Sequence, residues 1–154
     1  GSLPLAATLC RRDIFDAHYS DDRAKTFFHS SSYTANPICC AAAVANLGIW
    51  SSEPVLERVA ALAAAQAMQL QFLAADEHFS GFRQTGTISA FDLKVPNSGY
   101  LAVAALKLRA KFLERGILLR PLGNTIYVMP PYCITPDELK HVYDAVRAVA
   151  RDGV

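Results

Sequence analysis

The chain has 154 residues, of which 52% are hydrophobic and 19% are charged, and its 15 basic and 14 acidic side chains leave a net charge of +1. This hydrophobic content excludes an intrinsically disordered protein, which needs few apolar groups and a high net charge. The balanced charge gives no drive toward nucleic acid or an acidic membrane surface, and no apolar run reaches the ~18 residues of a membrane-spanning helix.

The first third of the chain combines short structured segments with a long polar loop. Residues 3–10 form an apolar run that predicts a buried strand, and residues 11–19 predict a short helix. A core strand rarely opens a domain without a lead-in, so we expect residues 1–50 to be the tail of a larger domain. Residues 20–36 are hydroxyl-rich, and a loop of about 17 residues in a compact domain is uncommon and often functional.

Helices are predicted over most of the next forty residues. Asn36 is a preferred N-cap, and Pro37 suits the first helical position because its missing N–H would have no partner there. We expect this helix to extend to Trp50. A long helix is predicted over residues 54–75, where apolar residues recur at helical spacing: Leu56, Val59, Leu62, Ala63, Leu70 and Leu73.

The remainder of the chain mixes strand and helix patterns. Strands are predicted at residues 83–94, 117–120 and 125–129, and helices at residues 100–115 and 135–151. Gly116 is typical of the position after a helix, and Gly123 with Asn124 supplies a turn. Thr135 and Glu138 have the spacing of a capping box. These patterns predict a small α+β domain, an antiparallel sheet of about three strands covered by helices.

The serines at positions 30, 31 and 32 lie shortly before a predicted helix N-terminus. Hydroxyls and backbone N–H groups in such a place suit a phosphate group. Ser and Asn also cap turns in ordinary solvated loops, and composition alone favours this second interpretation.

Arg120 ends an apolar segment beside a glycine turn, and Tyr127 lies on the segment that follows the turn. An arginine can bind a carboxylate through two parallel hydrogen bonds. The alternative is an edge-strand arginine that points to water, with a purely structural Arg–Tyr pair across the hairpin. The pattern leaves both interpretations open.

The four cysteines, at positions 10, 39, 40 and 133, have no spacing typical of a metal site, so we expect none. Thiols in apolar, Ala-rich segments are expected to be small buried hydrophobes. Unpaired thiols are typical of a reducing compartment, which predicts a cytoplasmic protein.

Three segments in this order resemble the C-terminal part of the class III pyridoxal-phosphate aminotransferases: residues 3–8 (LPLAAT), 29–37 (HSSSYTANP) and 120–132 (RPLGNTIYVMPPY). The third is most similar to the branch of the family that acts in biotin synthesis. The resemblance implies an α/β protein of the fold-type-I class, with residues 1–50 as the tail of the large cofactor-binding domain. Residues 51–154 would be a long connecting helix and the C-terminal α+β small domain.

The resemblance also implies roles for five residues. Ser31 and Ser32 would hold the phosphate of pyridoxal 5'-phosphate in the partner's site across a homodimer interface, and Ser30 would lie near the substrate. Glycine is usual at position 30 in this family and threonine at position 32, so Ser32 keeps the hydroxyl. Arg120 would bind the carboxylate of 8-amino-7-oxononanoate, Tyr127 would line its channel, and S-adenosylmethionine would be the amino donor.

The lysine that carries the cofactor in this family lies upstream of the segment matched by residues 3–8, and the lysines present here, at 25, 94, 107, 111 and 140, do not match it. We therefore expect a C-terminal portion that contains no catalytic residue, is inactive by itself, and works with the missing N-terminal portion. Two alternatives remain: another class III aminotransferase acting on an ω-amino acid, or a non-catalytic α+β module for dimerisation or ligand sensing.

Overall fold

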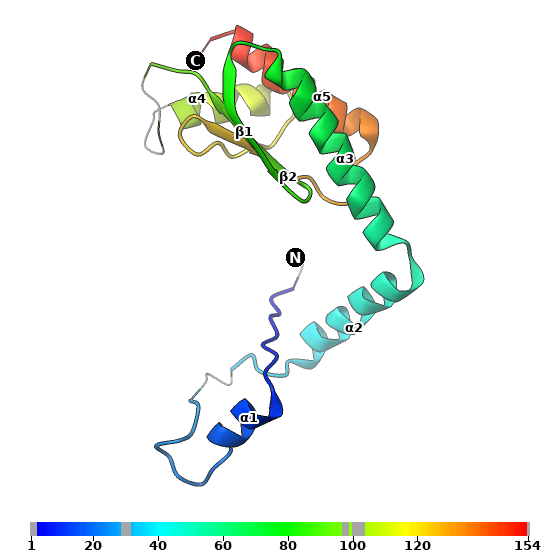
Figure 1. The fold of residues 1–154 in the computed structure, drawn as a ribbon, viewed down its shortest axis with the longest axis vertical. Coiled ribbons are helices and arrows are strands. Elements are labelled where there is room, and N and C mark those ends of the chain that lie inside the picture. Colours follow the sequence, from blue (N-terminus) through cyan, green and yellow to red (C-terminus); the bar gives the residue numbers. More distant parts are fainter. Residues whose placement is uncertain (1–2, 29–31, 97–98, 100–103, 154) are drawn as a thin grey trace. The chain divides into compact units, whose positions relative to one another are not determined.

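The computed structural model describes residues 3–28, 32–96, 99 and 104–153 (Figure 1). The chain forms two compact units, residues 1–53 and residues 54–154. Among the described residues, no single helix is long and apolar enough to cross a membrane, and only α2 (Pro37–Ser52) and α3 (Val55–Ala74) taken together have that length and composition.

The first unit contains two helices, α1 (Arg12–His18) and α2 (Pro37–Ser52), as predicted. The Asn36 cap is confirmed, because its Oδ1 accepts hydrogen bonds from the N–H groups of Ile38 (3.0 Å) and Cys39 (3.3 Å). The strand predicted at residues 3–10 is wrong, since these residues form no regular structure. A strand exists only through hydrogen bonds to a neighbour, and the described part of this unit holds no other strand.

Helix α2 is apolar on all sides, yet its large side chains are exposed. Ile38 and Val44 are each 69% exposed and Leu47 is 63% exposed. Helices that are hydrophobic all round are typical of the interior of a larger protein. The prediction of buried thiols is wrong for three of the four cysteines, because only Cys39 is buried and the others are exposed: Cys10, Cys40 and Cys133.

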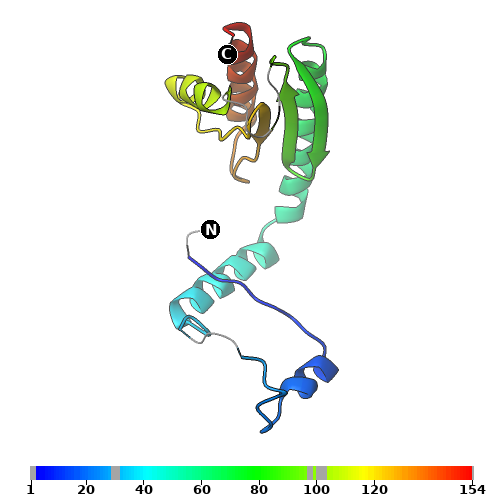
Figure 2. The ribbon, with the colours of Figure 1, turned by 90° about the vertical axis from the view of Figure 1, so that its left-hand side faces the viewer.

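The second unit is an antiparallel sheet covered by helices, as predicted. Its elements are α3 (Val55–Ala74), β1 (Phe79–Thr85), β2 (Ile88–Leu93), α4 (Ala104–Glu114), β3 (Thr125–Val128) and α5 (Pro136–Arg151). The strand order is β1-β2-β3 with both pairs antiparallel. In Figure 2 the strands β1 and β2 run alongside α3. Helices α3 and α5 cover the same face of the sheet, because Ser89 of β2 contacts Gln66 of α3 and Tyr143 of α5.

The single strand predicted at residues 83–94 is wrong, because two strands form a hairpin there. The strands β1 and β2 are joined by Gly86 and Thr87, and Thr85 pairs with Ile88. Gly86 has a φ of 54°, which a residue with a side chain rarely adopts. A two-residue loop with glycine first is typical of a tight hairpin, and the β-forming residues on both sides hid this signal.

The strand predicted at residues 117–120 is also wrong. The N–H of Ile117 donates to the carbonyl of Phe112 (2.9 Å) and so closes the end of α4. Gly116, with a φ of 73°, ends that helix as predicted. Ile117 and Leu119 are still buried, so this segment contributes apolar side chains to the core without joining the sheet. Part of the helix predicted at residues 100–115 lies outside the described residues.

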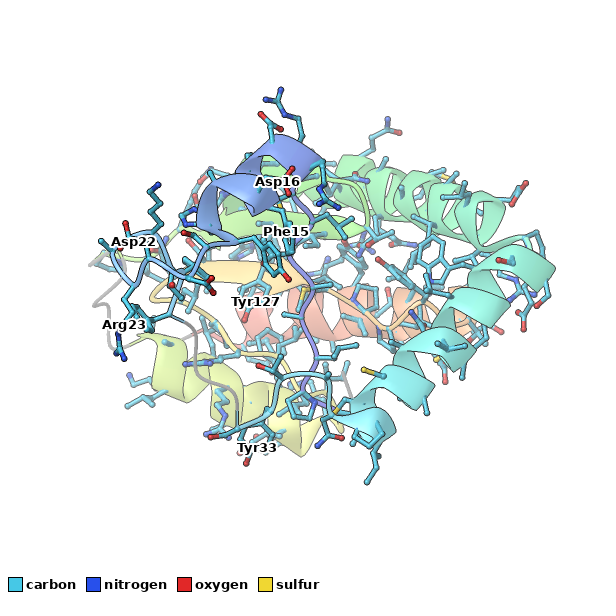
Figure 3. The ribbon with its side chains drawn as sticks, turned by 90° about the horizontal axis from the view of Figure 1, so that it is seen from below. Phe15, Asp16, Asp22, Arg23, Tyr33 and Tyr127 are labelled. Carbon is cyan, nitrogen blue, oxygen red and sulfur yellow. The ribbon has the colours of Figure 1, made fainter. Side chains whose placement is uncertain are left out.

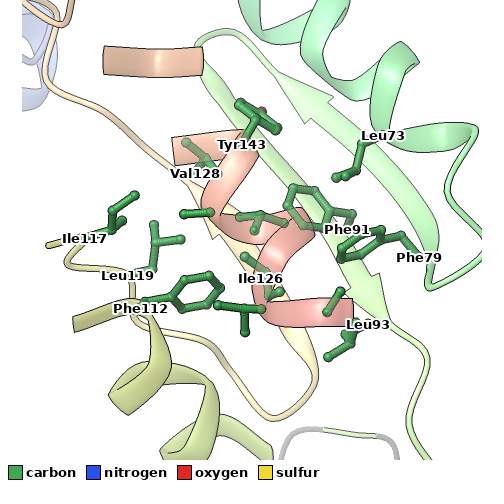
Figure 4. Close-up of a cluster of buried hydrophobic side chains, with 14 of the residues drawn as sticks. Leu73, Phe79, Phe91, Leu93, Phe112, Ile117, Leu119, Ile126, Val128 and Tyr143 are labelled. Atoms are coloured by element: carbon green, nitrogen blue, oxygen red, sulfur yellow. The ribbon is translucent and has the colours of Figure 1, made fainter. Parts of the chain in front are cut away.

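The core lies between the sheet and the helices, and its centre is aromatic (Figure 4). Phe91 is fully buried, and its ring meets that of Phe79 edge-on with a centroid distance of 5.5 Å. The ring of Tyr143 lies 6.3 Å from that of Phe91. Alternate residues of β2 and β3 face this core, which leaves the other side chains of both strands on the opposite, open face of the sheet.

The capping box at the start of α5 is confirmed. The Thr135 N–H donates to Glu138 Oε2 (2.8 Å), and the Glu138 N–H donates to Thr135 Oγ1 (3.3 Å). The hydrogen bonds from the backbone N–H and the hydroxyl of Thr135 lower the pKa of the Glu138 carboxyl. Because this pKa is lower in the folded state, the stabilisation is present above the ordinary Glu pKa and is lost as the pH falls through the lowered one.

Replacing Thr135 with alanine should lower the free energy of unfolding by about 1 kcal/mol at neutral pH, because it removes the side-chain cap of α5. Urea unfolding of the two proteins measures the difference. Thr85→Ala, at the exposed end of β1, is the control and should change stability by less than about 0.5 kcal/mol. An unchanged midpoint for Thr135→Ala would mean that water replaces the cap.

Candidate substrate and phosphate sites

A tight turn fixes the segment that carries Arg120 and Tyr127. Leu122 and Thr125 exchange two backbone hydrogen bonds, with N···O distances of 2.8 and 3.0 Å. Gly123 between them has a φ of 63°. The turn residue Asn124 is buried, and its side chain donates to the Leu93 carbonyl (2.9 Å) and accepts from the Gly99 N–H (2.7 Å). These contacts connect the turn to the end of β2, and sequence reasoning treated Asn124 only as a turn former.

Arg120 and Tyr127 lie on the two segments that flank this turn, each two residues from the isolated Leu122–Thr125 bridge. Exposure alternates along the first segment, where Leu119 and Pro121 are buried and Arg120 is exposed. Tyr127, labelled in Figure 3, is half-buried on β3 between two residues that face the core, so it lies on the open face. The turn connects the two segments, and the pairing of Arg120 with Tyr127 at one site stays a prediction.

Arg120 is an exposed cation that makes no ion pair or hydrogen bond with any residue the structure describes. Arg83, on β1, differs because its guanidinium lies 3.3 Å from Asp92, and that carboxylate also accepts from Thr125 Oγ1 (2.6 Å). Arg83 is thus neutralised by a neighbour, whereas Arg120 is available to a carboxylate from outside. A planar guanidinium is suited to binding such a group with two hydrogen bonds.

The serine loop is only partly described. Ser30 and Ser31 lie outside the described residues, whereas Ser32 is exposed in a bend and forms no hydrogen bond within the described part of the chain. The N–H groups of Ile38 and Cys39 already donate to the Asn36 side chain. These two N–H groups therefore serve the helix cap, and the phosphate role of the serines stays a prediction. The Ser32 hydroxyl remains, as a neutral donor that fits a phosphate oxygen.

The two predicted halves of the site belong to different units of the structure, Ser32 to residues 1–53 and the pair Arg120–Tyr127 to residues 54–154. A mainly apolar pocket of about 570 Å³ lies beyond the end of β3, and neither Arg120 nor Tyr127 lines it. Within the ranges that the structure describes, no group of three metal-ligating side chains comes together.

Comparison with protein families matches residues 1–149 to the Aminotransferase class-III family. The adenosylmethionine-8-amino-7-oxononanoate aminotransferase of Synechococcus elongatus is 42% identical over 147 residues, which cover 95% of this chain and 34% of that protein. The protein of the same name from Helicobacter pylori is 40% identical and is matched over 91% of this chain and 33% of its own length. The chain spans about a third of the length of these curated relatives.

Solved structures of transaminases also match this chain. The crystal structure of adenosylmethionine-8-amino-7-oxononanoate aminotransferase from Methanocaldococcus jannaschii matches with a TM-score of 0.75 and 30% identity, over 84% of this chain and 31% of that one. A transaminase with L-alanine has a TM-score of 0.75 at 20% identity, over 92% of this chain and 34% of that one, which shows a shared fold.

Proposed function

The chain belongs to the class III aminotransferases, and we propose that the enzyme of which it forms part transfers an amino group from S-adenosylmethionine to 8-amino-7-oxononanoate, giving 7,8-diaminononanoate. Relatives named for these two compounds are 42% and 40% identical to this chain. The observation that carries the proposal is Arg120, an exposed cation without a partner among the described residues, on the segment that a tight turn connects to Tyr127.

The role of this chain in the reaction is to hold the oxo acid. Arg120 binds the substrate carboxylate through two parallel hydrogen bonds, and this fixes the distance from the carboxylate to the reacting carbonyl. Tyr127 lines the path between them, and its ring restricts which acceptors fit. The open face of the sheet thus selects a substrate that carries a carboxylate at one end.

Class III aminotransferases depend on pyridoxal 5'-phosphate. When bound, this cofactor supplies the electron sink for amino transfer. The Ser32 hydroxyl fits its phosphate as a hydrogen-bond donor, and we assign the same role to Ser31 and a place near the substrate to Ser30. We further propose a homodimer in which these serines serve the partner's site.

The proposed function is tested by incubating the full-length enzyme with S-adenosylmethionine and 8-amino-7-oxononanoate and measuring 7,8-diaminononanoate by mass spectrometry. Product that depends on both compounds supports the proposal. Turnover of ω-amino acids without this product would assign the enzyme to another branch of the family. The absence of any transamination would support a non-catalytic module.

Replacing Ser32 with alanine in the full-length enzyme should weaken the binding of pyridoxal 5'-phosphate about 10- to 100-fold, because a hydrogen bond to a charged group contributes roughly 1.5–3 kcal/mol. Titration of the apo-enzyme with the cofactor measures this. Ser51→Ala is the matched control, because the Ser51 hydroxyl donates to the Leu47 carbonyl (3.1 Å) within α2. Equal dissociation constants for all three proteins would make the serine loop a simple connector.

A further inference from the structure

A polar cluster that the proposed function does not use lies in the core of the second unit. It consists of Gln66 on α3, Ser89 on β2 and Tyr143 on α5, and all three are fully buried. The Ser89 and Tyr143 hydroxyls lie 2.6 Å apart. Both also hydrogen-bond to Gln66 Oε1, at 3.1 Å from Ser89. Burial raises the pKa of Tyr143 to about 12, so its hydroxyl stays protonated and able to donate.

The amide nitrogen of Gln66 donates hydrogen bonds to two backbone carbonyls. It donates to the carbonyl of Thr87 (3.0 Å), next to the start of β2, and to that of Val128 (3.3 Å), the last residue of β3. With its oxygen accepting from two hydroxyls, the carboxamide uses both of its donors and both lone pairs of its acceptor. Its orientation is therefore determined by four contacts.

The hydrogen bond from Gln66 to the Val128 carbonyl lies at the end of β3, where the pairing with β2 stops. Ser89 and Val128 form the last pair of the β2–β3 ladder. After Met129 the chain continues as Pro130 and Pro131, which have no N–H group with which to extend a ladder. Gln66 therefore provides the tertiary hydrogen bond that holds the strand where the sheet pairing ends.

We propose that Gln66 is a positioning residue for the substrate carboxylate site, an inference that rests on the proposed function. Tyr127 directly precedes Val128, and its hydroxyl forms no hydrogen bond within the described residues. Its ring therefore follows the backbone of β3, which Gln66 anchors from the opposite face of the sheet. Arg120 and Tyr127 flank the turn that the Leu122–Thr125 bridge closes, so a shift of β3 displaces the Tyr127 ring relative to Arg120 and loosens the fit of the oxo acid.

The test compares Gln66→Met with Tyr143→Phe in the full-length enzyme. Gln66→Met keeps the volume but removes both donors to Thr87 and Val128. Tyr143→Phe removes a hydroxyl from the same cluster, yet it leaves those two donors in place, so it is the matched control for lost stability. For each variant we would measure the melting temperature, the KM for 8-amino-7-oxononanoate and the rate of the half-reaction with S-adenosylmethionine.

We expect both variants to melt at a lower temperature, but only Gln66→Met to raise the KM for the oxo acid, by about tenfold, since small misplacements of binding groups are costly. The donor half-reaction should be unchanged in both. Equal KM values in the two variants would overturn the inference and make the cluster purely structural. If Gln66→Met does not fold, Gln66→Asn, whose shorter side chain cannot reach both carbonyls, replaces it.

Failure of the proposed function gives a different result from failure of this inference. A wild-type enzyme that does not convert 8-amino-7-oxononanoate overturns both. A wild-type enzyme that does convert it, together with an unchanged KM in Gln66→Met, overturns the positioning role alone.

Discussion

Replacing Arg120 with alanine in the full-length enzyme should impair the reaction with the oxo acid while leaving the reaction with the amino donor nearly intact. Truncating one partner of a charge pair shielded from water costs roughly 2–5 kcal/mol. Since about 1.4 kcal/mol corresponds to a factor of ten, kcat/KM for 8-amino-7-oxononanoate should fall at least about 30-fold. S-adenosylmethionine need not present its carboxylate to Arg120, which is why the loss should be selective.

Single-turnover kinetics of each half-reaction measure this selectivity. Arg120→Lys should restore little, because a single ammonium group does not reproduce the two parallel hydrogen bonds of a guanidinium. Arg109→Ala is the control, an exposed arginine on α4 that should behave as the wild type. Equal losses in both half-reactions would make Arg120 a structural or cofactor residue, and no loss in either would make it an ordinary surface arginine.

Replacing Phe91 with alanine should have the largest effect on stability, about 3–5 kcal/mol. The Phe91 side chain is fully buried, and its ring contacts those of Phe79 and Phe82 on β1 and of Tyr143 on α5. Alanine would leave a cavity at the centre of the core that these rings can only partly fill. This cost is a large fraction of the ~5–15 kcal/mol that stabilises a typical domain.

Urea unfolding of the 154-residue chain, followed by tyrosine and tryptophan fluorescence, would measure the change. Phe72→Ala on α3 is the matched control, because Phe72 is 62% exposed and its loss should cost less than about 0.5 kcal/mol. Similar midpoints for the two variants would contradict the packing described here.

Local chemistry accounts for the elements that were predicted correctly. The caps at Asn36 and Thr135 act within three or four residues, so the sequence is sufficient to place the starts of α2 and α5. The apolar spacing of α3 likewise depends only on neighbouring turns of one helix. The strand expected at residues 3–10 could not be predicted in this way, because a strand depends on partners distant in sequence.

The candidate site was predictable to different degrees. The turn at Gly123 and Asn124, which connects the segments of Arg120 and Tyr127, was predictable from its own residues. The role of Gln66 depends on carbonyls 21 and 62 residues away, which no local pattern contains. One signal was available, because Gln66 is a polar residue on the apolar stripe of α3, four residues from both Leu62 and Leu70.

The most direct test of the proposed specificity compares amino acceptors for the full-length enzyme loaded with amino groups from S-adenosylmethionine. We expect kcat/KM for 8-amino-7-oxononanoate to exceed that for its methyl ester, which lacks the carboxylate, by at least about 100-fold, the discrimination available to a paired binding group. Arg120→Ala should remove most of this preference. Equal use of the two acceptors by the wild-type enzyme, or a preference that survives in Arg120→Ala, would contradict the assignment of the carboxylate site to Arg120.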